Sequence, residues 1–128
     1  MSAANDRGIW SGLPGDLALI AREGDPAPGA AAGTLFKQFS TASTNAQGHI
    51  AFMGSLANNS GGVDASNDHG LWIADPHGVE IFQIAREGEV LADGTITTLA
   101  FAGGSGGEDG RRSGLNDDGQ VAYTASLD

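Results

Sequence analysis

Short apolar stretches separated by glycine-rich turns run along the whole chain. Around Leu17, Leu19 and Ala21 the side chains alternate with a period of two, which is typical of a strand and not of a helix. Strands are predicted at residues 8–11, 16–22, 34–41, 48–56, 70–74, 78–86, 95–102 and 119–127. No segment has a helical pattern, so the sequence predicts an all-β protein.

The pattern of the first half of the chain returns in the second half, about 60 to 70 residues later. The matched segments are Gly8-Ile9-Trp10 with Gly70-Leu71-Trp72, Ile20-Ala21-Arg22-Glu23-Gly24 with Ile84-Ala85-Arg86-Glu87-Gly88, and residues 45–52 with residues 116–123. We therefore predict two repeats, residues 5–66 and 67–128, each with four strands in an antiparallel meander.

The repeated positions are predicted to have structural roles, because every repeat needs turns and packing residues whereas an active site is rarely present in each one. These positions are Trp10, Arg22, Glu23, Asn45, Gly48, Phe52, Asn67, Gly70, Trp72, Arg86, Glu87, Asn116, Gly119 and Tyr123. In the Asn-x-x-Gly segments, asparagine is expected to cap the turn and glycine to supply a positive φ.

Two alternatives remain open for these positions. The arginines of the Arg-Glu pairs are expected to form structural ion pairs or turn contacts, but arginines lining a central channel would instead bind an anion. Trp10 and Trp72 are expected to pack between sheets. An exposed tryptophan would instead stack on a sugar ring.

Repeated four-stranded meanders are the blades of a β-propeller, which has typically four to eight blades. Two blades in one chain are too few, so we expect completion by homo-oligomerisation, as a cyclic assembly of three or four identical chains. Residues 3–6 match residues 65–68. The C-terminus of one chain is therefore expected to meet the N-terminus of the next.

Charge and composition exclude several functions. The net charge is −10, from 6 basic and 16 acidic residues, so nucleic acid and anionic membranes are not expected partners. Cysteine is absent, which excludes thiolate chemistry and disulfides. No apolar run reaches the ~18 residues of a membrane span. The 21 glycines suit a chain with many tight turns.

Candidate catalytic chemistry is weak. Ser105 lies in a G-x-S-x-G pattern, but no helix-forming pattern follows it, so we expect a loop; a hydrolase would rest on this serine alone. His49, His69 and His77 lack metal-ligand spacing. We therefore predict no catalytic residue, no cofactor and no metal ligand.

The segments Asn45-x-x-Gly48-x-x-Ala51-Phe52 and Asn116-x-x-Gly119-x-x-Ala122-Tyr123 resemble the bacterial tandem-repeat proteins named for their NxxGxxAF motif. Tyr123 replaces the phenylalanine of that motif. The resemblance implies an extracellular or cell-surface location and no established activity. We predict a scaffold or binding module without catalysis. The alternative is a ligand-binding propeller, lectin-like or anion-binding, that uses its loops or central channel.

Overall fold

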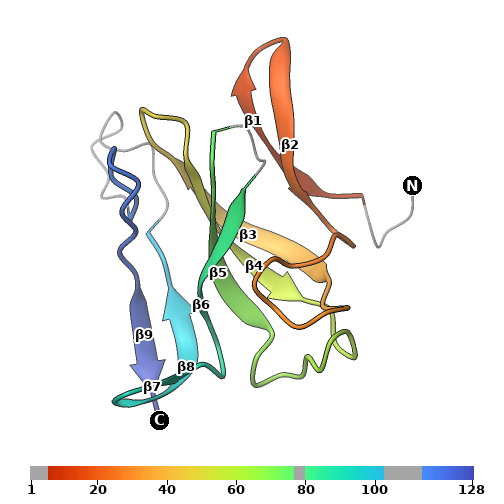
Figure 1. Cartoon of the computed structure of the whole chain (residues 1–128), viewed down its shortest axis with the longest axis vertical. Coiled ribbons are helices and arrows are strands. Elements are labelled where there is room, and N and C mark those ends of the chain that lie inside the picture. The colour runs from red at the N-terminus through yellow and green to blue at the C-terminus, as the bar shows by residue number, and fades with distance from the viewer. Residues whose placement is uncertain (1–5, 77–79, 103–113) are drawn as a thin grey trace.

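A computed structural model describes residues 6–76, 80–102 and 114–128, which form antiparallel sheets without any helix (Figure 1). The strands are β1 (Gly8–Leu13), β2 (Asp16–Arg22), β3 (Phe36–Thr44), β4 (Ile50–Leu56), β5 (His69–Ala74), β6 (Ile81–Arg86), β7 (Val90–Leu91), β8 (Gly94–Ala100) and β9 (Thr124–Leu127). The all-β prediction is confirmed. Accordingly, the described part of the chain holds no helix that is long and apolar enough to cross a membrane.

Each predicted strand overlaps an observed one, with bounds that differ by a few residues at several ends. Residues 78 and 79 of the predicted strand 78–86 lie outside the described residues. The short strand β7 was not expected from the sequence. The last strand is shorter than the predicted 119–127, because β9 begins at Thr124 and is preceded only by an isolated bridge between Leu115 and Val121. Residues 116–120 are held in a turn by hydrogen bonds to the Asn116 side chain, so they are not available to extend the strand.

The strands are grouped differently from the prediction. We expected two four-stranded meanders in chain order. In the described residues, one four-stranded sheet has the order β3-β4-β5-β6, while β1-β2 and β7-β8-β9 form smaller sheets. The four-stranded sheet, called the central sheet below, joins two strands from residues 5–66 to two strands from residues 67–128.

The connections explain this grouping. Residues 23–35 lead the chain from one sheet to the next, and a short ladder closes the connection: Gly24 N–H donates to Phe36 O, and Phe36 N–H donates to Asp25 O, both at 2.9 Å. Residues 57–68 instead return the chain to the same sheet, where Leu56 N–H donates to Asp68 O at 2.7 Å. A periodic sequence identifies the strands but not the connection at which one sheet ends.

Each small sheet has the register of one half of the central sheet. Hairpin β1–β2 has an irregularity between Ile9 and Trp10, and hairpin β5–β6 has one between the matching Leu71 and Trp72. Hairpin β8–β9 shifts register after Ile96, as β3–β4 does after Phe36. Hairpin β3–β4 has a further irregularity between Phe39 and Ala42, beyond the part of the ladder that β8–β9 shares with it.

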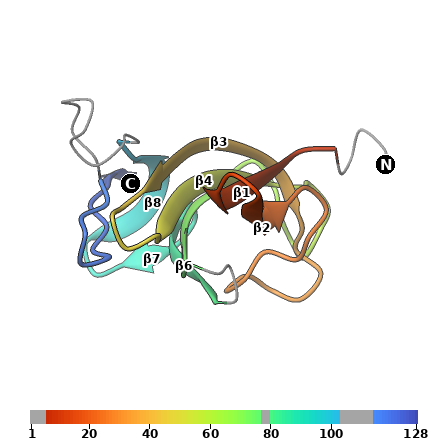
Figure 2. The same cartoon turned by 90° about the horizontal axis from the view of Figure 1, so that it is seen from above.

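The core lies on both faces of the central sheet. Along β4, Ile50 and Phe52 belong to a cluster with residues of β1–β2, whereas Ala51 and Met53 contact a second cluster with Phe101 and neighbouring residues. Sheet β1-β2 lies on one side of the central sheet and the β7–β9 strands lie on the other (Figures 1 and 2). A strand covered on both faces is apolar on both, which explains the continuous burial of β4.

Candidate functional site

The apolar face of β1–β2 that points away from the central sheet is exposed. Trp10 is 54% exposed, and Leu17 and Leu19 are 60% and 44% exposed. Trp10 lies opposite Leu19 in the register of the two strands, so the three side chains share one face. We call these three residues the outer face. Within the described residues β1 pairs with β2 alone, so its far edge also has unpaired backbone groups.

A second apolar surface lies on the opposite side of the molecule. Phe82 is 60% exposed, although it lies on the same face of β6 as Ile84, which packs against the second core cluster. Ile73 of the neighbouring strand β5 packs there too. We call Ile73, Phe82 and Ile84 the open face, because the β8–β9 hairpin leaves Phe82 uncovered.

Strand β9 also has an open edge. It pairs with β8 in the described structure, and all four of its residues are exposed. Tyr123 just before it is 37% exposed and Leu127 is 43% exposed. Strands β1 and β9 are therefore both edge strands, on sheets at opposite sides of the central sheet (Figure 2).

The residues that match these exposed aromatics are buried in the central sheet. Trp72 and Phe52 are both 0% exposed, lie opposite each other on β5 and β4, and stack with ring centroids 6.0 Å apart at 18°. The indole N–H of Trp72 donates to Pro28 O at 2.9 Å. Aromatic residues at matching positions are thus buried in the central sheet and exposed on the two smaller sheets.

The two Asn-x-x-Gly turns have matching hydrogen bonds. In each turn the asparagine Oδ1 accepts N–H groups two and four residues on, at 3.1 and 2.9 Å. Gly48 and Gly119 have φ values of 87° and 79°. The turns also touch each other, because Asn45 Nδ2 donates to Asn116 O at 2.8 Å. The asparagine turns therefore connect neighbouring sheets as well as reversing the chain.

The charged pairs lie at the strand ends. Arg22 ends β2 and Arg86 ends β6, and the Arg86 guanidinium donates to Asn67 O at 2.8 Å. Glu23 is buried, and its N–H donates to Arg7 O at 2.9 Å. The other repeated positions serve local packing or turns: Gly70 lies under the Trp72 ring, and Asn67 Oδ1 accepts Asp64 N–H at 2.8 Å. Ser105 and His77 lie outside the described residues.

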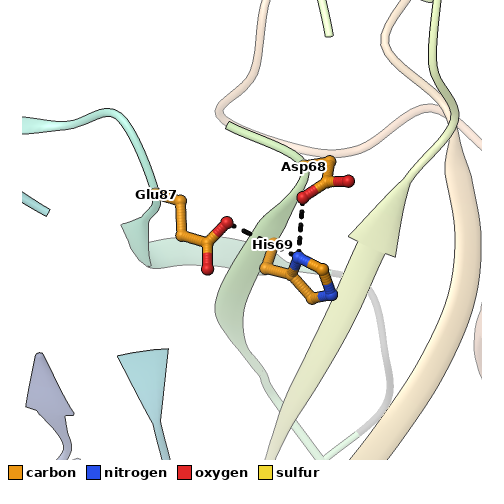
Figure 3. Close-up of side chains that lie close together, drawn as sticks. All are labelled: Asp68, His69 and Glu87. Carbon is orange, nitrogen blue, oxygen red and sulfur yellow. Dashed lines mark hydrogen bonds and ion pairs between the residues drawn. The ribbon is translucent and has the colours of Figure 1, made fainter. Parts of the chain in front are cut away.

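A small cluster of ionisable side chains forms where β5 begins and β6 ends (Figure 3). His69 Nδ1 lies 2.7 Å from Asp68 Oδ1 and 3.5 Å from Glu87 Oε2. Burial raises the pKa of Glu87; Asp68 adds to this rise, and His69 opposes it. This cluster was not predicted. Its signal in the sequence is an Asp-basic-Gly segment at the start of both β1 and β5, with a glutamate directly after both β2 and β6.

The arrangement favours an ion-pair role over a metal site. One atom from each side chain lies within 4.8 Å of the others, and an imidazole with two carboxylates is a set that divalent ions accept. However, the residues matching Asp68, His69 and Glu87 are Asp6, Arg7 and Glu23. Arginine keeps the positive charge but cannot ligate a metal, so the matching positions do not repeat a metal-ligand set.

These observations define the class of protein: an all-β protein of several antiparallel sheets. The chain belongs to a family of unknown function, DUF7453, whose model matches residues 1–128. No curated protein and no solved structure matches it. The resemblance to NxxGxxAF repeat proteins stays a prediction.

Proposed function

We propose that the protein is a self-assembling β-propeller module, in which identical chains associate head to tail into a ring and serve as a scaffold or binding platform without catalysis. The observation that supports this proposal is that a four-stranded sheet lies beside a two-stranded and a three-stranded sheet, whose hairpins β1–β2 and β8–β9 would together supply the strands of a second four-stranded sheet. Three or four chains would give six or eight blades, within the range of typically four to eight for propellers.

The two hairpins lie apart within one chain, and a second copy of the chain would bring them together. Hairpin β8–β9 has the register of β3–β4, and hairpin β1–β2 has the register of β5–β6. They lie on opposite sides of the central sheet (Figure 2). A head-to-tail contact brings β8–β9 of one chain beside β1–β2 of the next, and it closes into a ring when the rotation between chains allows.

The exposed apolar surfaces fit this arrangement. Within one chain, β1–β2 packs against the Trp72 side of the central sheet through Ile9 and Ile20. In a sheet assembled between chains, the outer face with Trp10 would lie against the open face with Phe82. Both surfaces would then lose contact with water, which stabilises the assembly by about 25 cal/mol for each Å² of apolar surface.

Charge acts against this association. A net charge of −10 on each chain repels identical chains, and the repulsion weakens as salt shortens the screening length. Apolar burial and strand pairing must therefore supply the favourable free energy. The resemblance to bacterial surface repeat proteins supports an extracellular role for such an assembly.

The test is native mass spectrometry of the purified chain across a dilution series, with light scattering at matched concentrations. The proposal predicts a discrete trimer or tetramer that dissociates on dilution without a ladder of intermediate sizes, because a closed ring has no open ends. A chain that stays monomeric at high micromolar concentration would overturn the proposal, and an open-ended series of sizes would replace the ring by a filament.

A further inference from the structure

We propose that β9 of one copy pairs in antiparallel fashion with β1 of a second copy, in the register that places Tyr123 opposite Trp10. This inference rests on the proposed assembly and specifies its contact. The proposed ring needs apolar faces to stack. Pairing of β9 with β1 would add a continuous backbone ladder between chains, which stacked faces do not require.

The pattern for this contact lies inside the chain, at the pairing of β4 with β5. There Phe52 lies opposite Trp72, and three further pairs follow along the ladder. These pairs are Met53 with Leu71, Gly54 with Gly70, and Ser55 with His69. This ladder connects the two hairpins of the central sheet, so it is the contact that the separate halves lack.

The residues of β9 and β1 that match these β4–β5 pairs give the pairs expected between chains. Residues 52–55 match residues 123–126, and residues 69–72 match residues 7–10. The resulting pairs are Tyr123 with Trp10, Thr124 with Ile9, Ala125 with Gly8, and Ser126 with Arg7. Hairpin β1–β2 has the irregularity of β5–β6 at the matching position. Hairpin β8–β9 has the register of β3–β4 from Ala125 to Leu127, and Tyr123 must extend β9 by one residue to pair with Trp10.

Side-chain volumes support this register. Gly54 in the central sheet corresponds to Ala125, so the contact between chains must accept one additional methyl group. A Cβ built at Gly54 would meet Gln38 O at 3.3 Å, Trp72 Cζ3 at 3.4 Å and Phe36 Cδ1 at 3.5 Å, so its neighbours would have to move by a few tenths of an ångström. Phe36 corresponds to the smaller Ile96, which leaves more room on the β8 side. Ala125 therefore fits.

Backbone contacts at the end of β9 already match those at the end of β4. Ala57 N–H donates to Leu35 O at 2.8 Å, and Asp128 N–H donates to Thr95 O at 2.9 Å. β9 is therefore held on β8 as β4 is held on β3, with its other edge free for pairing. One contact is not reproduced: Pro28 O, the partner of the Trp72 indole, lies in a connection that is shorter before β8.

Cysteine cross-linking tests the register, because the chain has no cysteine of its own. Leu56 N–H donates to Asp68 O, so the next pair, Ser55 with His69, lies at a non-hydrogen-bonded position. Such pairs have Cα atoms about 4.5 Å apart, within the range that a disulfide spans. The matching pair between chains is Ser126 with Arg7, and both residues are exposed in the single chain.

The experiment mixes two single variants, Arg7→Cys and Ser126→Cys, under mild oxidation, so that any disulfide between unlike chains is intermolecular. The control mixes Arg7→Cys with Thr124→Cys, which lies on the same strand face but two residues out of register. We expect the first mixture to give unlike dimers at least about tenfold faster than the control, with circular dichroism of each variant unchanged.

The outcomes separate this inference from the proposed ring. A discrete oligomer in native mass spectrometry without preferred cross-linking of Arg7→Cys to Ser126→Cys would overturn the strand contact and leave the ring. Equal rates in both mixtures would overturn the register. Faster formation of like dimers of Arg7→Cys would indicate pairing of two β1 edges and overturn the inference. A protein that is monomeric throughout would overturn both proposals.

Discussion

Trp72 and Trp10 stand at matching positions and have opposite environments. Trp72 is fully buried in a complete sheet with a neighbour on each face, whereas Trp10 is 54% exposed on a sheet with one neighbour. The same contrast separates Phe52 from Tyr123. Burial in this protein is therefore a property of the position of a hairpin within a stack of sheets. The same substitution at two matching positions is therefore expected to affect folding stability at one and association at the other.

The largest effect is expected from Trp72→Ala. Trp72 packs against Phe36 and Phe52, with ring centroids 4.9 and 6.0 Å away, so its removal leaves a cavity at the centre of the larger core cluster. Truncations of this kind cost about 3–5 kcal/mol of unfolding free energy. Urea denaturation followed by circular dichroism would measure the loss. Unchanged stability would contradict the burial of this residue.

The matching change, Trp10→Ala, is expected to act on association. Its side chain is half exposed in the single chain, so the unfolding free energy of a dilute sample should change by less than about 1 kcal/mol. If Trp10 is buried between chains, its loss should cost about 2 kcal/mol or more of association free energy, as hot-spot residues do. Sedimentation against dilution measures this, with Phe82→Ala expected to act in the same direction. A variant that associates normally would exclude the outer face from the contact.

A smaller difference is expected between the asparagine turns. Asn45→Ala and Asn116→Ala each remove an acceptor for two backbone N–H groups. Asn45→Ala also removes the bond to Asn116 O at the junction of two sheets. Asn45→Ala should therefore cost about 1 kcal/mol more than Asn116→Ala in a thermal melt of the dilute chain. Equal losses would mean that the hydrogen bond from Asn45 Nδ2 to Asn116 O contributes nothing to stability.

The smallest effect is a pH dependence from the cluster at the start of β5. Burial raises the pKa of Glu87 above its usual value of 4.5. The stability that this shift contributes is fully present below 4.5 and is lost as pH rises through the folded-state pKa. As pH rises above 4.5, Glu87→Gln should therefore lose less stability than the wild type, whereas Glu80→Gln, at an exposed position, should follow the wild type. Parallel curves for wild type and Glu87→Gln would contradict the shift.

Much of the strand content could be predicted from residue patterns. The alternation in Asp16–Arg22 predicts β2 with the bounds observed. The Asn-x-x-Gly segments that begin at Asn45 and Asn116 lie at turns with positive φ at Gly48 and Gly119. The prediction is wrong for Gly70, which lies within strand β5 and does not have a positive φ. These features depend on residues a few positions apart, so a local pattern is enough to predict them. Strand β7 has only two residues, too few for a periodic signal.

The candidate surfaces were harder to predict. Nothing near Trp10 distinguishes it from Trp72, because both follow a Gly-apolar pair and both precede a second strand. The pairing of His69 with Glu87 was also missed, since the two residues are 18 positions apart and meet only because β5 and β6 form a hairpin. Such contacts depend on strand register, which local sequence does not specify.

The sequence by itself therefore determined the all-β class, the positions of most strands and turns, and the match between the two halves of the chain. Side-chain alternation and turn chemistry act over a few residues, and a repeated segment folds in a similar way wherever it recurs. Only the tertiary structure decided that β4 pairs with β5, that the central sheet is complete, and that Trp10 and Phe82 stay exposed. A repeated sequence pattern does not show at which strand a sheet begins. The boundary between sheets is therefore set by the connections that carry the chain from one sheet to the next.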